Sequence, residues 1–413
     1  MQSKYKPIGD YIRLVDERNK ELKVTTLLGL SISKEFIPSV ANIVGTNMRN
    51  YKIIRKDQFA CSIMQVRRDG KMPVALLEDI DQAIISQAYP VFEIIDTKVL
   101  LPQYLMMWFS RSEFDRQATF HAVGGVRGSL EWEDFLAFEL PVPSIEKQRE
   151  IVREYNVIEN RITLNQQLNK KLEETAQTLY KHWFVDFNFP ITKENCPELV
   201  SGSPELIGRP YKSSGGKMVY NEELKKEIPK GWEPQRLDFI AKICAGGDRP
   251  KVFSENETLK NRVPIYSNSS VKDGIYGYTN LPKINEPSIT ISARGAIIGF
   301  TVLRTKPFFP IIRLIVITPN DNYQFGFLYN AILNFKFDNQ TSSAQGQLTI
   351  PDISSYKIMY PKISVLKMYQ KQFEVINERI EIFKKEIEKH KELKDILLSK
   401  MVKVEEEKNI SCL

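Results

Sequence analysis

Residues that build catalytic and metal sites are scarce in this sequence. The 413 residues include four cysteines and three histidines. The cysteines are widely separated and form no Cys-x-x-Cys pair, so the sequence predicts neither a zinc site nor a disulfide framework: Cys61, Cys196, Cys244 and Cys412. The histidines form no His-x-His or His-Glu-x-x-His motif: His121, His182 and His390. We therefore expect no metal and no cofactor in this chain.

Long apolar runs are also missing. Stretches such as 296–300 and 311–318 are short and interrupted by polar residues, which predicts no transmembrane helix. The first residues contain no apolar core of the kind that a signal peptide has. Together these absences favour a cytoplasmic protein without a membrane partner. The net charge of +7 is compatible with a polyanionic partner, although it is weak evidence alone.

Catalytic motifs are equally hard to find. The segment 214–217 ends in Gly-Lys, but Met218 follows where a P-loop needs Ser or Thr, so a plain linker is the better interpretation. The glycines of 124–128 do not form a Gly-x-Gly-x-x-Gly fingerprint. There is no Asn-Pro-Pro-aromatic tetrad and no nuclease-like carboxylate and lysine set. The sequence predicts a chain that is not itself an enzyme.

Two long stretches with helical periodicity dominate the chain. The first, 145–184, has no Pro or Gly and predicts a helix of roughly 60 Å. Its apolar residues recur every three or four positions, as in a coiled-coil seam: Ile151, Tyr155, Ile158, Ile162, Leu168, Leu172, Ala176, Leu179 and Trp183. The second, from 362 to about 403, repeats this spacing: Phe373, Ile376, Ile380, Phe383, Ile387, His390, Lys394, Leu397 and Met401.

These stretches belong to an internal repeat. Residues 157–162 align with 375–380, an offset of 218 positions from Val157 to Val375. The same offset places Gly128 on Gly346, and it persists without gaps into both helices. The chain therefore predicts a unit of globule and long helix that occurs twice.

The regions before the helices have mixed patterns, which predict an α+β class. The first contains strand-like stretches and one amphipathic helix: 51–54, 60–64, 74–77, 91–95 and 104–116. The second, which begins near 228, contains a similar set: 264–267, 288–291, 296–302, 313–317 and 325–335. Between the first helix and the second globule, the segment 191–227 is rich in Ser and Gly and predicts a linker.

Basic and polar side chains occur in the expected turns of both globules. Arg, Lys, Asn and Gln read base edges in the major groove, whereas Ser, Tyr and Lys commonly hold phosphates. In the first globule the candidates are Arg67, Arg68, Lys71 and Arg127. In the second they are Ser267, Asn268, Lys272, Tyr276, Tyr278, Arg294, Gln345 and Gln347. Each residue alone is more simply a solvated turn residue, but two such globules on a helix pair favour nucleic-acid binding.

The chain resembles the specificity subunit of type I restriction–modification enzymes. The residues that carry the resemblance are the repeat, the segment 172–187 at the end of the first long helix, the opening 228–237 of the second globule, and the helix entry 140–151. The sequence departs from the family pattern at the second helix entry, where Leu366 and Lys367 replace the Gln-Arg pair. The first globule also lacks the Gly-Trp opening.

This resemblance implies two target-recognition domains that alternate with two long helices. The helices would pack as an antiparallel coiled coil with pseudo-two-fold symmetry. The implied boundaries are 1–143 for the first domain, 144–190 for the first helix, 191–227 for the linker, 228–361 for the second domain, and 362–413 for the second helix and tail. Each domain would read half of a bipartite site in double-stranded DNA.

The resemblance also implies partners. Two modification subunits would dock on the helical region, and two restriction subunits could join them. S-adenosylmethionine, ATP and Mg²⁺ would then belong to those partners. The implied subunit-interface residues are Tyr180, Trp183, Phe184, Phe187, Ile158, Ile162, Ile376 and Ile380. Two other functions remain open: a stand-alone DNA-binding protein, and a coiled-coil assembly protein without DNA affinity.

Overall fold

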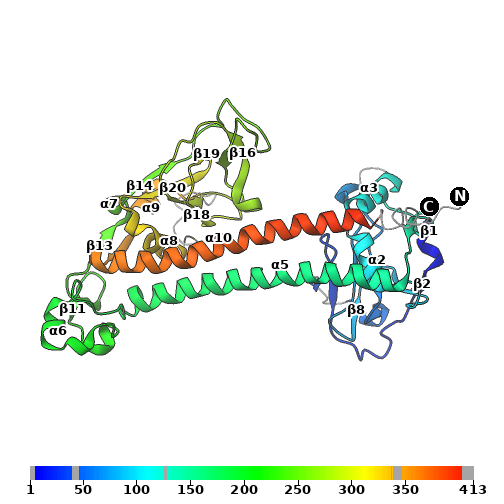
Figure 1. Ribbon diagram of the computed structural model, residues 1–413, viewed down its shortest axis with the longest axis horizontal. Helices are drawn as coiled ribbons and strands as arrows, with labels where there is room; N and C mark the ends of the chain where they lie inside the picture. Colours follow the sequence, from blue (N-terminus) through cyan, green and yellow to red (C-terminus); the bar gives the residue numbers. More distant parts are fainter. Residues whose placement is uncertain (1–4, 40–45, 125–127, 336, 338–346, 402–413) are drawn as a thin grey trace, which may run out of the picture. The chain divides into compact units, whose positions relative to one another are not determined.

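A computed structural model of the protein describes residues 5–39, 46–124, 128–335, 337 and 347–401 (Figure 1). The chain forms two compact units. Unit 1 consists of Met1–Gln166 and Lys384–Leu413, and unit 2 consists of Gln167–Phe383. Each unit therefore contains one globule and part of both long helices. Within the described ranges, no helix is both long and apolar enough to cross a bilayer.

Unit 1 is built on a four-stranded antiparallel sheet in the order β2-β9-β6-β7. These strands are β2 (Ile12–Val15), β6 (Phe59–Cys61), β7 (Val74–Leu76) and β9 (Val91–Ile94). Three two-stranded sheets accompany it: β1 (Tyr5–Pro7) with β10 (Glu139–Pro141), β3 (Leu28–Leu30) with β4 (Phe36–Pro38), and β5 (Lys52–Arg55) with β8 (Gln82–Ile85). The helices are α1 (Val66–Asp69), α2 (Pro102–Phe109), α3 (Ser112–His121) and α4 (Trp132–Leu136), with short 3-10 turns at Ile8–Asp10 and Met48–Asn50.

Aromatic side chains form the core of unit 1. Phe59 and Phe92 are cross-strand partners whose rings stack with centroids 4.9 Å apart. Phe109 of α2 meets both rings edge-on. Such pairs add to the stability that comes from burying the rings. The single helix predicted over 104–116 is two helices, because α2 ends at Phe109 and is capped by Ser110, whose N–H and hydroxyl both donate to the Met106 carbonyl.

Unit 2 contains a four-stranded sheet with the same connectivity, β14-β20-β17-β18. These strands are β14 (Ala241–Ala245), β17 (Ser288–Ser292), β18 (Thr301–Arg304) and β20 (Leu314–Pro319). Smaller sheets are formed by β11 (Met218–Asn221) with β12 (Lys226–Pro229), by β13 (Glu233–Arg236) with β21 (Lys357–Tyr360), and by β15 (Val263–Tyr266) with β16 (Ile275–Thr279) and β19 (Phe309–Pro310). The helices are α6 (Pro197–Gly202), α7 (Leu237–Ile240), α8 (Phe325–Leu333) and α9 (Ile350–Ser354), with 3-10 turns at Pro204–Leu206, Lys212–Ser214, Val271–Gly274 and Asn322–Gln324.

The two globules share more than the sequence repeat suggested. In both sheets each strand pairs antiparallel with its neighbours, and the four strands occur in the same order along the chain. A short helix, an edge strand and a long helix then follow at a constant offset of 218, as in α4 and α9, which begin at Trp132 and Ile350. The smaller sheets differ: β5 pairs antiparallel with β8, whereas β15 pairs parallel with β19. The globules therefore share a scaffold and differ in what is added to it.

The predicted strand over 296–302 is wrong for its first half. The strand β18 begins only at Thr301, and residues 296–299 form a turn. Gly295 and Gly299 have φ of +82° and +84°, a left-handed conformation that glycine adopts without steric cost. These two glycines turn the chain back, so that β17 and β18 form a hairpin.

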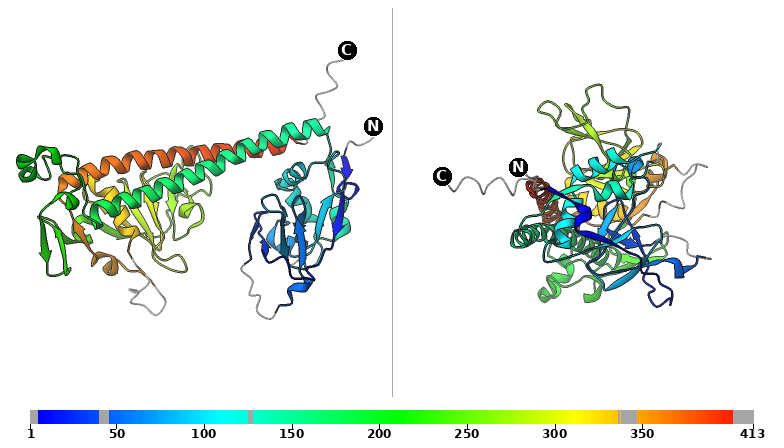
Figure 2. Two further views of the ribbon diagram at one scale, coloured as in Figure 1. Left: turned by 90° about the horizontal axis from the view of Figure 1, so that it is seen from below. Right: turned by 90° about the vertical axis from the view of Figure 1, so that its right-hand side faces the viewer.

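Both long helices form close to their predicted bounds. Helix α5 spans Ile145–Tyr180 and continues into a π-helical turn over Lys181–Val185, and α10 spans Ile363–Lys400. Within each unit the two helices lie side by side (Figures 1 and 2). In unit 1, Glu159 pairs with Lys394, and the Asn165 amide donates to Glu386 across 2.9 Å. Because the residue number rises on α5 while it falls on α10, the segments run antiparallel.

The seam differs from its predicted form at one point. Leu168 is 37% exposed, whereas Asn165 and Asn169 are only 1% and 8% exposed. The helix therefore turns two amides inward, and it leaves the leucine at its surface. Of the nine seam positions predicted on α10, none is fully exposed.

The segment 191–227 is not an open linker. It contains α6, two 3-10 turns, β11 and the start of β12, and it places four side chains in the core of unit 2: Ile191, Cys196, Val200 and Tyr211. The Tyr211 ring stacks on Phe189 with centroids 4.6 Å apart, and Phe189 stacks on Trp232 at 5.1 Å. The segment has few apolar residues, but these four are buried in the core and attach it to unit 2.

A glycine sets the approach of α8 to α10. A methyl group on Gly326 would lie 2.4 Å from Cγ of Phe373. We expect Gly326→Ala to lower the free energy of unfolding by about 1–3 kcal/mol, as overpacking commonly does. Urea denaturation of the full chain measures this effect. Gly202→Ala is the matched control, because nothing lies within 4 Å of a methyl group there. Equal losses for both variants would contradict the prediction.

Candidate nucleic-acid interface

Three of the predicted contact residues in unit 2 are joined through the backbone of Arg294, which binds the Asn268 side chain and pairs with Gln347. The Asn268 amide donates to the Arg294 carbonyl across 2.9 Å, and the Arg294 N–H donates back to Asn268 Oδ1 across 3.2 Å. Arg294 also forms a β-bridge with Gln347. The loops that carry these residues lie far apart in sequence. The structure therefore brings Asn268, Arg294 and Gln347 to one place on the globule.

The loop of Asn268 leads directly into β16. Ser267 N–H donates to the Gly274 carbonyl across 2.8 Å, which closes the loop, and Lys272 lies exposed on it. Tyr276 and Tyr278 both lie on β16, whose pairing with β15 shifts register beside Tyr276. The ring of Tyr276 packs against Phe253 at 5.5 Å. Gln345 lies outside the described residues.

The predicted basic turn of unit 1 is a helical turn, α1. Arg67 and Arg68 are exposed on it and Lys71 follows it, also exposed. The Arg67 N–H donates to the Gly128 carbonyl and its Nη1 donates to the Gly124 carbonyl at 3.3 Å, so this side chain touches the predicted glycine loop. Arg68 pairs with Asp69 at 2.6 Å, and its hydrogen bond lowers the pKa of the Asp69 carboxyl. Arg127 lies outside the described residues.

Arg67 and Arg294, one predicted contact residue from each globule, lie in equivalent turns of the shared topology. In unit 1 the turn between β6 and β7 begins at Gln65, whose φ is +63°, and in unit 2 the turn between β17 and β18 begins at Gly295. The Leu130 N–H donates to the Ile63 carbonyl at 2.9 Å, and the Leu348 N–H donates to the Ala293 carbonyl at 2.8 Å. Arg67 and Arg294 thus belong to equivalent turns. Each turn is hydrogen-bonded to the segment that leads into a short helix, α4 in unit 1 and α9 in unit 2.

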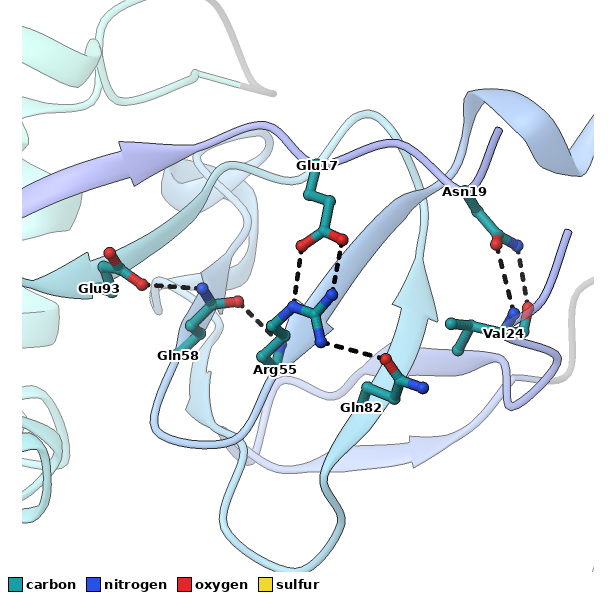
Figure 3. Close-up of polar contacts among 7 residues, drawn as sticks. All are labelled: Glu17, Asn19, Val24, Arg55, Gln58, Gln82 and Glu93. Atoms are coloured by element: carbon teal, nitrogen blue, oxygen red, sulfur yellow. Dashed lines mark hydrogen bonds and ion pairs between the residues drawn. The ribbon is translucent and has the colours of Figure 1, made fainter. Parts of the chain in front are cut away.

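A polar network that the sequence did not indicate lies on another part of unit 1 (Figure 3). Arg55 donates to both carboxylate oxygens of Glu17, at 2.9 and 2.7 Å, and to Gln82 at 3.3 Å. The hydrogen bond from Arg55 lowers the pKa of the Glu17 carboxyl. Gln58 accepts from the Arg55 N–H and donates to Glu93 at 2.8 Å. Arg55 and Gln82 lie on the small β5–β8 sheet, and Glu93 lies on β9 of the four-stranded sheet. The network therefore connects the two sheets through Gln58.

The four aromatic residues implied to contact a partner subunit lie inside unit 2. The side chains of Tyr180, Trp183, Phe184 and Phe187 are buried in its core, where burial alone raises the pKa of Tyr180. They cannot reach a partner while the unit is folded, so their assignment as interface residues is corrected. The implied aliphatic residues face the helix seam and are buried or half-buried: Ile158, Ile162, Ile376 and Ile380.

In the described parts of the chain, no three His, Cys, Asp or Glu side chains are placed so that they could hold a metal ion.

The sequence model of one protein family, the type I restriction modification DNA specificity domain, matches this chain twice. The matches cover residues 24–174 and 229–397, which together are more than half of the chain. The chain belongs to the type I restriction–modification DNA specificity family.

Relatives within this specificity family extend over most of the chain. It is 26% identical over 326 residues to the MjaIX specificity subunit of Methanocaldococcus jannaschii, which covers 75% of this chain and 70% of the relative. It is 22% identical to the HindI specificity subunit of Haemophilus influenzae, covering 88% and 89%. The crystal structure of the type I S subunit from M. genitalium has a similar fold, with a TM-score of 0.57 at 16% identity and coverage of 96% and 95%.

Proposed function

We propose that this chain is the DNA specificity subunit of a type I restriction–modification complex, in which each globule reads one half of a bipartite site in double-stranded DNA. The observation that carries the proposal is the double match to the family domain. The first match contains β3 to β10 and most of α5, and the second contains β13 to β21 and most of α10. Two equivalent turns with exposed arginine or lysine nearby suit two half-sites.

The helices have a separate role in this proposal. Helices α5 and α10 form an antiparallel coiled coil over their full length, with pseudo-two-fold symmetry between the repeats. The pair acts as a ruler, because a continuous helix keeps a fixed rise of about 1.5 Å per residue. Of the boundaries implied above, 1–143 and 228–361 are the two recognition domains, and 144–190 and 362–413 contain the helices. The folded segment 191–227 belongs with the second domain.

The chemistry in this proposal belongs to partner subunits. Two modification subunits dock on the helical region and bind S-adenosylmethionine, and two restriction subunits that use ATP and Mg²⁺ can join them. The specificity subunit contributes site selection alone. Its docking surface must lie on exposed side chains, because the aromatic residues first implied are buried.

Methylome sequencing tests the proposal. The chain is expressed with the modification subunit encoded beside it, and we expect methylation at a split motif with a fixed spacer that disappears when the chain is deleted. Arg67→Ala with Arg68→Ala should relax one half of the motif, and Arg294→Ala should relax the other. Unchanged methylation after deletion would refute the function and favour a coiled-coil assembly protein. Tight specific binding without partners would favour a stand-alone DNA-binding protein.

A further inference from the structure

The loop 267–274 has an unusual backbone. Lys272 and Asp273 have φ of +48° and +54°, and Gly274 follows with +84°. In a left-handed conformation the Cβ atom lies too close to the following carbonyl oxygen, so residues with a side chain rarely adopt it. Two in succession persist only where surrounding contacts determine the backbone. The loop that carries Ser267, Asn268 and Lys272 therefore needs a support.

A buried arginine supplies that support. Arg304 lies at the end of β18 with 6% of its surface exposed. Its Nη2 donates to the Asp273 carbonyl at 2.5 Å, and its Nε donates to Thr290 Oγ1 at 3.1 Å. Its guanidinium lies 3.5 Å from the centre of the Tyr266 ring. The side chain thus connects the central sheet with the left-handed part of the loop.

The support extends to a second loop. Asn268 forms its paired hydrogen bonds with the backbone of Arg294, so the position of the loop fixes the position of the turn between β17 and β18. That turn is bridged to Gln347 in turn. One buried guanidinium therefore holds the loop 267–274 directly, and through Asn268 and Arg294 it is connected to two further segments that carry candidate DNA-contact residues.

We propose that Arg304 is a positioning residue for DNA recognition by the second globule. It fixes the loop 267–274 and, through Asn268, the turn of Arg294 in the geometry that reads one half-site. This inference rests on the proposed function. It assigns Arg304 no contact with DNA, because the side chain is buried behind the loop that it holds.

The guanidinium suits this task because it is planar and carries its donors in a fixed fork. It can donate to a side chain and to a carbonyl in different directions while its face lies on a ring. A lysine keeps the charge but has one nitrogen, which cannot reproduce both donor directions and the stacking. Arg304→Lys is therefore the variant that separates charge from geometry.

Thr290→Val is the matched control. It removes the hydroxyl that accepts from Arg304 Nε and donates to the Val302 carbonyl, but it leaves the hydrogen bond from Arg304 to the Asp273 carbonyl. Thr290 is as deeply buried as Arg304. Both variants lose the hydrogen bond between positions 304 and 290. We expect only Arg304→Lys to displace the loop 267–274.

The experiment measures methylation by the complete methyltransferase complex on a library of sites with every single-base change in either half. Thermal unfolding of each complex is measured in parallel. For Arg304→Lys we expect discrimination in one half of the site to fall at least tenfold, with the other half unchanged. Thr290→Val should keep the wild-type pattern. Arg304→Gln, whose amide nitrogen lies where Arg304 has Nε and whose side chain is too short to reach the Asp273 carbonyl, replaces the lysine variant if that complex does not assemble.

Three results would overturn the inference. They are an unchanged pattern in the Arg304 variant that assembles, an equal loss of discrimination in both halves, and the same loss in Thr290→Val. The proposed function is judged separately, on the wild-type complex. If the wild-type pattern does not depend on this chain, the function fails. If the wild-type chain sets both halves and Arg304→Lys changes neither, only the positioning role fails.

Discussion

Trp183→Ala is expected to lower the free energy of unfolding by about 3–5 kcal/mol, the usual cost of truncating a buried tryptophan. Trp183 lies in the π-helical turn that ends α5 and is only 5% exposed. Its ring meets Tyr369 of α10 at a centroid distance of 5.6 Å and Phe184 at 6.3 Å. Truncation would open a cavity where the end of one long helix meets the start of the other.

Urea denaturation of the full chain, followed by intrinsic fluorescence and circular dichroism, measures this loss. Phe239→Ala is the control, because that ring is also aromatic but is 72% exposed. We expect the control to lose less than about 0.5 kcal/mol. If Trp183→Ala were as stable as Phe239→Ala, the ring would not be a core residue, and its earlier interpretation as a surface for a partner subunit would return.

The helices and the repeat could be predicted because their signals are periodic. Spacing of three and four residues persists over ten turns, and a constant offset of 218 needs no knowledge of packing. The departure at the second helix entry also has a physical explanation. The Gln148 amide is buried and bonds the Leu101 N–H and the carbonyls of Val99 and Pro143, whereas Leu366 at the equivalent position is buried as an apolar side chain.

The similarity between the two four-stranded sheets could not be predicted from the sequences of the two globules. Their central strands are Phe59–Cys61 and Ser288–Ser292, which have no residue pattern in common. In a strand that is buried on both faces, many small or apolar residues serve equally well. Equivalent turns also begin with different residues, Gln65 and Gly295, although both adopt positive φ. Backbone geometry is preserved at these positions while the side chains are not.

The candidate site was predicted in part, for a related reason. Exposed basic residues in turns can be found from composition, and Asn268, Arg294 and Gln347 prove to be neighbours. Their support could not be found in this way, since an arginine in a short strand, such as Arg304, looks like a surface residue. Burial lowers the pKa of its guanidinium, while Tyr266 and Asp273 nearby raise it. Only the three-dimensional contacts reveal which arginine holds a loop.

The second large effect concerns the helix pair as a ruler. Removing 160–166 from α5 together with 386–392 from α10 deletes two facing heptads, as the pairing of Asn165 with Glu386 shows. Asn165 and Glu386 leave together, so neither the amide nor the carboxylate remains without its hydrogen bond. Heptad spacing keeps the remaining seam in phase. The helix pair should shorten by roughly 10 Å, which corresponds to about three base pairs of B-DNA.

We therefore expect the methylated motif to keep both halves while its spacer becomes about three base pairs shorter. Three base pairs also turn one half-site by almost a third of a turn about the DNA axis, so we expect slower methylation. A variant that duplicates the same two heptads should lengthen the spacer by the same amount. Deleting the heptad from α5 alone leaves helices of unequal length and should abolish methylation. An unchanged spacer in both matched variants would show that the helix pair does not set the distance between half-sites.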